Sequence, residues 1–250
     1  MSSTRSERSM IFGSNADEYH RWRPTYPAEA VEWVLPSGAS VVADVGAGTG
    51  KVTESLLARG VRVVAVEPDH RMLDVLRRTY PKALAHESGA ENLPLPDDSV
   101  DAVLAADAWH WFPFEPAVAE VRRVLRQGGW LGLLWNVVAP VEDWQKGLAA
   151  LDPDYRPKPA EDDDAGEGPF PAAETATATF PWDWQTTPED WCSYLKTLSA
   201  FTLMDESERN DRLSRAHALV AAACEEYGTA TAPVRHEVFC ARWTPRLAER

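Results

Sequence analysis

Short apolar runs alternate with amphipathic stretches through the first half of the chain. The apolar runs predict strands at residues 41–45, 61–66, 83–86, 100–106 and 130–135. Their continuous apolar character is typical of strands that are buried on both faces. Helical spacing of apolar residues predicts helices at residues 52–59, after Asp69 and at residues 115–125. Strands alternating with helices predict an α/β fold with a doubly wound, Rossmann-like parallel sheet and right-handed crossovers.

Local signals set the expected ends of these helices. Asp69 is a suitable N-cap for the second helix, since its carboxylate can accept a bond from the first-turn amides. Gly60 is expected to end the first helix, and the pair Gly128-Gly129 is expected to close the third.

The second half of the chain has a different character. Residues 152–179 contain five prolines around the acidic run Glu161-Asp162-Asp163-Asp164, which predicts a surface insertion. Beyond it, helices are predicted at residues 188–198 and 206–227. Residues 236–244 alternate in polarity and are expected to form a final antiparallel strand.

The turn after the first predicted strand is rich in glycine, with the sequence GAGTGK at residues 46–51. A phosphate-binding loop GxxxxGK followed by Ser or Thr does not fit, because Val45 and Val52 stand at two of its required positions. A dinucleotide fingerprint GxGxxG would need its third glycine at Lys51 or Thr53, which weakens that interpretation. What remains is GxGxG with an acid, Asp44, two places before it.

This pattern resembles the class I S-adenosylmethionine-dependent methyltransferases, in the branch that methylates small molecules. The resemblance implies a seven-stranded sheet with an N-terminal lid and an insertion or cap after the fifth strand. It also implies S-adenosyl-L-methionine as the cofactor, held in part by the turn through Asp44, Gly46 and Gly48. Glycines at such a turn supply positive φ angles and let the backbone approach a ligand closely.

Glu67 ends the second predicted strand, where a carboxylate can accept bonds from both ribose hydroxyls. Dinucleotide-binding folds share this feature, so it does not separate the two families. The resemblance places Pro68 and Met72 beside the adenine, although Met72 also fits the core face of its helix.

Three further segments carry the resemblance. In SGAENLPLPDDSVD, residues 88–101, Ala90 and Glu91 are implied at the adenine edge. In DAWHWF, residues 107–112, the backbone carbonyl of Asp107 is implied to hold the cofactor's ammonium, although an amide residue is expected at this place in the family. The run HWF is similar to that of trans-aconitate methyltransferase-like proteins and related methyltransferases of carboxylates and small metabolites.

The third segment is DEYHRWRPTYP, residues 17–27, which resembles a lid over the cofactor. Here Arg23 is implied to pair with the methionine carboxylate, a contact that suits a guanidinium. A capping helix with ordinary surface charges is the alternative.

The composition of the chain limits which classes of binding partner are expected. The net charge is −14, and no basic face is visible, which argues against a nucleic-acid substrate. No apolar run approaches the ~18 residues of a membrane span, and the N-terminus lacks a secretory signal. The cysteines Cys192, Cys224 and Cys240 lie far apart without metal-ligand spacing, so we expect free thiols, no metal and a cytoplasmic location. A monomer or a homodimer is expected.

The expected organisation is one methyltransferase domain over residues 1–250. It comprises a lid (12–30), a cofactor-binding core (41–136), an insertion with cap helices (140–232) and a last strand (234–244). His110 is the candidate catalytic base because histidine titrates near neutrality, and a packing role in the pocket wall is the alternative. Tryptophans, among them Trp22, Trp109 and Trp111, suggest an apolar or aromatic acceptor.

The leading hypothesis is methyl transfer to a small organic acceptor, with oxygen favoured over nitrogen as the acceptor atom. Three alternatives stay open at this point: a cofactor-binding protein without catalysis, an N-methyltransferase of a small molecule or peptide, and a nicotinamide-dependent oxidoreductase.

Overall fold

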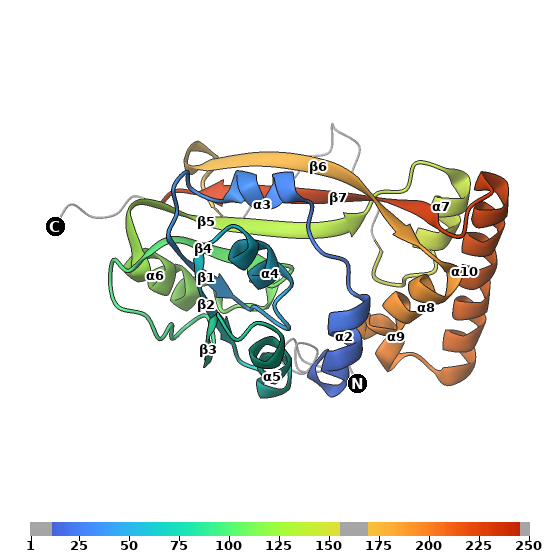
Figure 1. Ribbon diagram of the computed structural model, residues 1–250, viewed down its shortest axis with the longest axis horizontal. Helices are drawn as coiled ribbons and strands as arrows, with labels where there is room; N and C mark the ends of the chain where they lie inside the picture. The colour runs from blue at the N-terminus through green and yellow to red at the C-terminus, as the bar shows by residue number, and fades with distance from the viewer. Residues whose placement is uncertain (1–11, 156–169, 246–250) are drawn as a thin grey trace. The chain divides into compact units, whose positions relative to one another are not determined.

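Figure 1 shows the computed structural model of the chain, which describes residues 12–155 and 170–245. The acidic run Glu161–Asp164 lies outside the described residues. The strands are β1 Val41–Val45, β2 Arg62–Glu67, β3 Leu84–Glu87, β4 Val100–Ala106, β5 Leu125–Val138, β6 Thr175–Thr186 and β7 Ala232–Trp243. The α-helices are α2 Ala16–Trp22, α3 Ala28–Val34, α4 Lys51–Ala58, α5 His70–Thr79, α6 Phe114–Val124, α7 Asp143–Ala149, α8 Pro188–Lys196, α9 Ser199–Leu203 and α10 Glu206–Tyr227. Short 3-10 turns are η1 Phe12–Asn15, η2 Trp109–Trp111 and η3 Ala172–Glu174.

The strands form one seven-stranded sheet in the order β3-β2-β1-β4-β5-β7-β6, which confirms the predicted fold class. The strands β3, β2, β1, β4 and β5 pair in parallel. The chain reverses direction in β7, whose end bonds to the start of β6 through Thr244 N–H and Glu174 O at 3.1 Å (Figure 1). The sheet is therefore mixed, as expected from the antiparallel last strand.

The strand order changes direction between β1 and β4. From β1 the chain steps outward to β2 and β3, and then it returns to β4 and β5 on the other side of β1. Right-handed crossovers place the helices of these two halves on opposite faces of the sheet. Ligands of such sheets bind at the carboxyl ends of the strands that flank this switch point. The loops after β1 and β4 are therefore the first place to look for a site.

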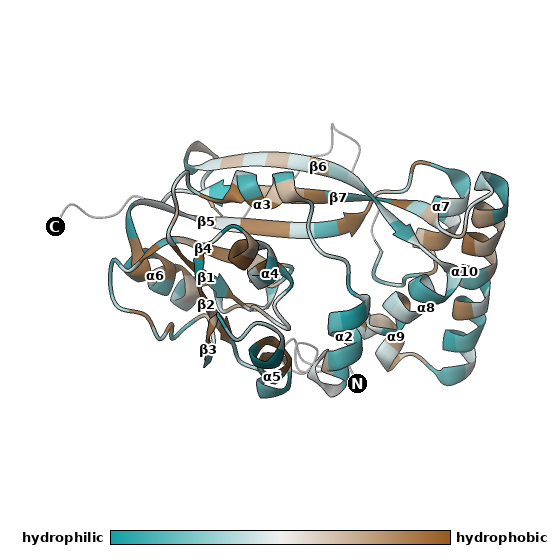
Figure 2. Cartoon of the chain, in the orientation of Figure 1, coloured by the Kyte–Doolittle hydropathy of each residue, from teal (hydrophilic) through white to brown (hydrophobic). Residues whose placement is uncertain are grey.

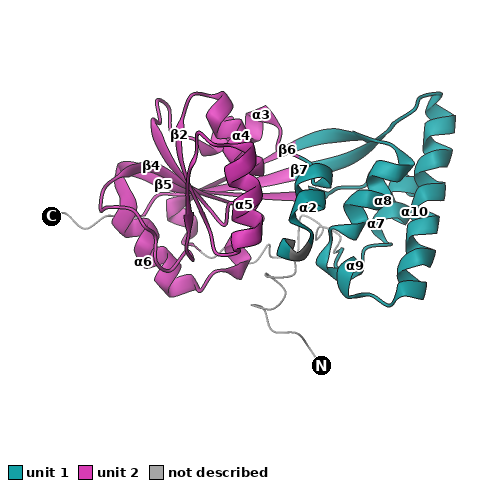
Figure 3. Cartoon of the chain, turned by 60° about the horizontal axis from the view of Figure 1, so that its bottom comes forward, with its two compact units in different colours: residues 1–24, 137–163, 181–237 teal, residues 25–136, 164–180, 238–250 magenta. Residues whose placement is uncertain are grey.

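The chain divides into two compact units, coloured in Figure 3. Unit 1 contains residues 1–24, 137–163 and 181–237, and unit 2 contains residues 25–136, 164–180 and 238–250. Each of β5, β6 and β7 runs from one unit into the other. The expectation of a single domain stays a prediction.

The core of unit 2 is built from the central strands and α6. All five residues of β1 are buried, and β1, β2, β4 and β5 are coloured as hydrophobic over much of their length in Figure 2. This burial explains why their sequences read as continuous apolar runs rather than alternating ones. Asp69 caps α5 as predicted, because its side chain accepts a bond from Arg71 N.

One expectation about an element boundary was wrong. The glycine pair 128–129 does not close α6, which ends at Val124, and β5 begins at the next residue. Both glycines lie in β5 near a register shift against β4, and Gly128 has a φ of 83°. A Cβ at Gly129 would lie 2.7 Å from Asp101 O, so these glycines serve an irregular strand pairing.

The predicted surface insertion, residues 152–179, contains regular structure that its proline-rich and acidic composition did not indicate. Its last residues enter β6, the edge strand of the sheet, where Pro181 is tolerated because an edge strand can lack an amide donor. Phe170 is buried in unit 2, where its ring stacks on Trp243 with centroids 4.2 Å apart. The helices α3, α7 and α9 were also not predicted, whereas α2 corresponds to the helix that was the alternative for residues 17–27.

Candidate functional site

The glycine turn after β1 has the backbone geometry that its sequence predicts. Gly46, Gly48 and Gly50 have φ angles of 68°, 56° and 92°, a region that residues with a Cβ rarely adopt. A Cβ at Gly46 would lie 2.6 Å from Ala108 Cβ, and one at Gly50 would lie 2.7 Å from the Tyr80 ring. At Gly48 the nearest atom is Met72 Cε at 3.5 Å. Gly46 and Gly50 are therefore fixed by close packing, whereas Gly48 is fixed mainly by its φ angle.

Both carboxylate oxygens of Glu67 accept backbone hydrogen bonds. Its Oε2 accepts from Gly48 N–H and its Oε1 accepts from Asp69 N–H, each at 2.9 Å. The side chain is 8% exposed, and this burial raises the pKa of Glu67 to about 7, although the two backbone bonds oppose the rise. Each carboxylate oxygen keeps a second lone-pair site. Glu67 therefore links the glycine turn to the end of β2 and can still accept further hydrogen bonds.

Asp44 faces the protein interior. Its Oδ2 accepts from Thr53 Oγ1 at 2.6 Å, and burial raises the pKa of Asp44 to about 6. This bond joins β1 to α4 across the glycine turn. Asp44 was predicted to bind the cofactor. In this geometry its side chain bonds Thr53 at the start of α4 and so stabilises the glycine turn from the interior side.

Pro68 and Met72 continue from Glu67 into α5. Pro68 is exposed, and Met72 is buried with its Cε beneath Gly48. Met72 therefore lies on the buried face of α5 and also beside the glycine turn, so both interpretations of this residue hold together.

Thr49 is a residue that sequence reasoning missed. It lies between two of the glycines and is 1% exposed. Its Oγ1 has no hydrogen-bond partner among the residues that the structure describes. Buried hydroxyls are normally hydrogen-bonded, so this one marks a place for a polar ligand or an ordered water. The sequence signal that could have identified Thr49 was its hydroxyl side chain within the glycine motif GAGTGK.

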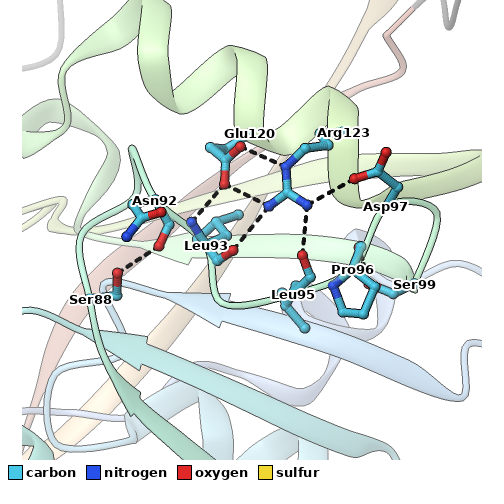
Figure 4. A network of polar contacts seen from close by, with 9 residues as sticks. All are labelled: Ser88, Asn92, Leu93, Leu95, Pro96, Asp97, Ser99, Glu120 and Arg123. Atoms are coloured by element: carbon cyan, nitrogen blue, oxygen red, sulfur yellow. Dashed lines mark hydrogen bonds and ion pairs between the residues drawn. The ribbon is translucent and has the colours of Figure 1, made fainter.

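The loop after β3, residues 88–99, is held by two side chains of α6, as Figure 4 shows. Arg123 donates to Leu93 O at 3.0 Å and to Leu95 O at 2.7 Å, and Glu120 Oε2 accepts from Leu93 N–H at 2.7 Å. Arg123 and Glu120 also pair with each other, at 2.7 Å. The guanidinium thus gives Leu95 O a partner and adds a second bond to Leu93 O, which also accepts from Leu95 N–H at 2.8 Å.

This loop carries the two residues implied at the adenine edge. Ala90 is buried in the core of unit 2 beside Leu93. Glu91 is exposed, and its carboxylate folds back over Gly89. Both therefore sit on a fixed loop rather than on a free one.

Asp107 follows β4 and has a φ of 49°, which is uncommon outside glycine. Its Oδ2 accepts from Tyr26 Oη at 2.6 Å, and its Oδ1 accepts from Asn136 N–H at 3.2 Å. Its own N–H donates to Leu134 O at 2.8 Å. The carboxylate thereby holds residues from three separate segments together, which explains why an acid can stand where the family pattern has an amide. Tyr26 is a second residue whose role sequence reasoning did not assign.

The segment of residues 109–112 is divided between core and surface. Trp109 is buried, and its ring contacts those of Phe112, Phe114 and Phe170, so among the tryptophans of this segment it is the one that packs in the core. His110 is exposed on η2, with its ring 4.7 Å from that of Trp111. The exposed His110 keeps the accessibility that a catalytic base needs.

Arg23 lies in unit 1. It donates to Thr197 O at 3.2 Å, and its guanidinium is 4.9 Å from the Tyr19 ring and 5.5 Å from the Tyr194 ring. Its predicted role toward the cofactor stays a prediction.

Unit 2 thus brings together Glu67, the glycine turn and Met72 through direct contacts. Asp107 shares the sheet edge, because β1, β2 and β4 are parallel and the residues in question follow their carboxyl ends. Over the described ranges 12–155 and 170–245, no group of three His, Cys, Asp or Glu side chains could hold a metal ion. Within the same ranges, none of the helices has the length and apolar character that crossing a membrane requires.

The donor set suits a nucleoside with an amino-acid tail. Glu67 offers acceptor capacity in a desolvated position, which suits paired ribose hydroxyls. Thr49 offers an unsatisfied hydroxyl beside backbone that lacks side chains at Gly48 and Gly50. These features fit S-adenosylmethionine.

Comparison with known proteins supports this assignment. Residues 43–133 match a family described as "Methyltransferase domain". An uncharacterized methyltransferase of Mycobacterium tuberculosis is 50% identical over 151 residues, which cover 60% of this chain and 62% of the relative. An uncharacterized methyltransferase-like protein of Schizosaccharomyces pombe is 36% identical over 150 residues, covering 58% of this chain and 59% of the relative. The match spans about three fifths of the length of these relatives.

A solved structure of a proposed type II methyltransferase from Anaeromyxobacter dehalogenans has 27% sequence identity and a TM-score of 0.63. The similarity covers 88% of this chain and 96% of that one. The domain match over residues 43–133 and the similarity of fold therefore agree with the resemblance to class I S-adenosylmethionine-dependent methyltransferases.

Proposed function

We propose that this chain, in which residues 43–133 form a methyltransferase domain of class I fold, transfers a methyl group from S-adenosylmethionine to a small organic acceptor. The observation that carries the proposal is that Glu67, at the carboxyl end of β2, accepts hydrogen bonds from Gly48 N–H in the turn after β1 and from Asp69 N–H. It presents a desolvated carboxylate with spare acceptor capacity beside a turn without side chains.

Each residue of the site has a proposed task. Glu67 accepts hydrogen bonds from the ribose hydroxyls, and Thr49 Oγ1 contacts the methionine tail. The backbone carbonyl of Asp107 accepts from the ammonium, while its side chain keeps Tyr26 and Asn136 in place. Gly46, Gly48, Pro68, Met72, Ala90 and Glu91 shape the surroundings of the nucleoside. When bound, the cofactor supplies a methyl group on a positively charged sulfur.

Positioning two reactants out of water is the main catalytic contribution that such a site can make. An acceptor hydroxyl must also lose a proton, and we assign that step to the imidazole of His110. We favour oxygen as the acceptor atom on this ground. An acceptor that is already an anion would not need the histidine.

The proposal extends to partners and location. A small metabolite is favoured over nucleic acid because the chain carries a net charge of −14. The cysteines Cys192, Cys224 and Cys240 are all unpaired, which supports a reducing, cytoplasmic compartment. We propose a monomer or a homodimer, which light scattering after size exclusion would determine.

The test is cofactor binding in matched variants. Wild-type protein is expected to bind S-adenosylmethionine with micromolar affinity, and Glu67→Ala should weaken binding by about 1.5–3 kcal/mol. Glu87→Ala is the control, because Glu87 is the exposed register partner of Glu67 on β3 and should have no effect. Unchanged affinity in Glu67→Ala by calorimetry would overturn the site.

Acceptor identity requires a separate measurement. Purified protein with cofactor is incubated with a metabolite extract, and mass spectrometry is used to detect products heavier by one methylene. A methylated small metabolite is expected. Robust methylation of tRNA or protein, with none of any small metabolite, would contradict the proposal.

A further inference from the structure

An aromatic cluster in unit 1 surrounds a buried histidine. The cluster consists of Trp182 and Trp184 on β6, Trp191 and Tyr194 on α8, and His236 on β7 (elements in Figure 3). The His236 ring centroid lies 5.3 Å from that of Trp182, 5.9 Å from Trp184 and 6.2 Å from Trp191. Trp191 in turn lies 5.0 Å from Tyr194. Three indole rings therefore contact one imidazole, and Tyr194 packs behind two of them against Trp184 and Trp191.

The hydrogen bonding of His236 defines its tautomer. Nδ1 lies 3.0 Å from Val234 O, and since a carbonyl can only accept, the proton is on Nδ1. Burial lowers the pKa of His236 to about 4, so the ring is neutral near pH 7. In a neutral ring with a proton on Nδ1, the other nitrogen, Nε2, is a hydrogen-bond acceptor.

Two polar atoms of the cluster lack partners. His236 Nε2 and Trp191 Nε1 are buried with no hydrogen-bond partner among the described residues, and both side chains are 1% exposed. One is an acceptor and the other is an N–H donor. Leaving both unpaired is costly, and native structures normally satisfy such groups with protein, water or ligand.

A hydroxyl group placed within hydrogen-bonding reach of both atoms would satisfy them together, because it donates one hydrogen bond and accepts others. A carboxylate would oppose the lone pair of Nε2, and an ammonium could not accept from Trp191. The surrounding rings favour an apolar or aromatic body for whatever carries the hydroxyl.

We propose that the cluster of Trp182, Trp184, Trp191, Tyr194 and His236 is a binding site for an apolar or aromatic molecule with a hydroxyl group, which donates to His236 Nε2 and accepts from Trp191 Nε1. The inference rests on the proposed function only in naming this ligand class as the class of the methyl acceptor. It assigns recognition, and it leaves the methylated atom open.

The test compares three probes that share a methylphenyl body. p-Cresol can donate and accept, 4-methylanisole can only accept, and toluene does neither. The wild-type chain is titrated with each, and the indole N–H signals of its 11 tryptophans are followed by nitrogen-edited NMR. The Trp191 signal is assigned as the one absent in Trp191→Phe. We expect p-cresol to shift this signal saturably and to bind roughly three- to tenfold more tightly than the other two probes.

Variants then remove one partner each. Trp191→Phe and His236→Phe should lower p-cresol affinity to that of toluene while leaving toluene binding unchanged. Trp144→Phe is the matched control, because the half-buried Trp144 indole in unit 1 already has a partner, Glu142, to which it donates at 3.1 Å.

The result would overturn the inference if p-cresol and toluene bound equally, if neither bound, or if the Trp191 signal did not move. A nuclear Overhauser contact from Trp191 Nε1–H to water that persists under saturating p-cresol would mean that a buried water satisfies the pair, and would also overturn it. These readouts in wild-type protein decide the matter even if a variant does not fold. Calorimetry with S-adenosylmethionine on the same samples is independent, so loss of cofactor binding would count against the proposed function alone.

Discussion

Glu67 occupies a position in which burial and hydrogen bonding oppose each other. Burial raises the pKa of its carboxyl to about 7, while Gly48 N–H and Asp69 N–H favour the ionised form. Ribose hydroxyls that donate to this carboxylate would favour the ionised form as well. Cofactor binding and the ionisation of Glu67 are therefore expected to be coupled.

This coupling predicts how affinity varies with pH. Since the cofactor binds the ionised form, its affinity should fall as the pH drops below 7, by at most about tenfold per pH unit. Above pH 7 the Glu67 contribution should level off. Calorimetry between pH 5.5 and 7.5 measures this, with Glu67→Gln as a variant that should bind more weakly and lose the part of the pH dependence centred near 7, leaving only what Asp44 contributes near pH 6. A flat wild-type profile would show that Glu67 does not contact the cofactor.

His110 is exposed beside Trp111, where an acceptor could reach it. If His110 is the base, His110→Asn should lower turnover by ~10²–10⁴-fold with little change in cofactor affinity. His86→Asn is the control, because His86 is exposed on β3 and carries no assigned role. Full activity of His110→Asn would exclude the base role and would favour an acceptor that is already an anion.

At the scale of elements, α6 holds the loop of residues 88–99 through Arg123 and Glu120 (Figure 4). Hydrogen bonds to a charged donor contribute more than neutral ones. Arg123 makes three of them to the loop: two to the carbonyls of Leu93 and Leu95 and one to the Asp97 carboxylate at 3.1 Å.

Arg123→Ala is accordingly predicted to destabilise the fold by about 2–3 kcal/mol and to weaken cofactor binding, because Ala90 and Glu91 lose their support. Urea unfolding and calorimetry measure the two effects. Arg122→Ala is the matched control on the neighbouring, exposed position of the same helix, and it should lose about 1 kcal/mol or less through its contact with the Trp243 ring. Equal losses in the two variants would argue against a specific role for Arg123.

The N-terminal segment of residues 12–27 was expected to be a lid. It contains η1 and α2, and Tyr26 at its end bonds Asp107 beside the site. We predict that cofactor slows amide hydrogen exchange in this segment, since lids that exclude water commonly order on ligand binding. Exchange at the exposed end of α10 serves as the internal reference. Identical exchange with and without cofactor would remove the lid.

For the whole molecule, charge sets the class of partner. The 39 acidic residues outnumber the 25 lysines and arginines. This net negative charge repels a polyanion such as a nucleic acid. We predict no detectable tRNA binding at ~10 µM protein in low salt, measured by filter retention. A salt-dependent affinity in the micromolar range would require a local basic face and would reopen the question of the acceptor.

The sequence by itself determined the parts of this protein whose causes are local. Continuous apolar runs predicted β1, β2 and β4. A strand that is buried on both faces is apolar at every position, and this pattern can be recognised in its own sequence. The spacing of Gly46, Gly48 and Gly50 predicted a turn of positive φ angles, because only glycine adopts them freely. Glu67 could be placed at the carboxyl edge because it ends a strand.

Only the tertiary structure decided the features that join residues distant in sequence. The bonds from Tyr26 to Asp107 and from Arg123 to Leu93 span 81 and 30 residues, and no local pattern encodes such pairs. The edge strand β6 was hidden because its short threonine-rich and proline-containing sequence resembles a loop until β7 supplies its hydrogen bonds. The neutral, buried state of His236 likewise arises from the tryptophans around it, since desolvation is a property of the surroundings and not of the residue.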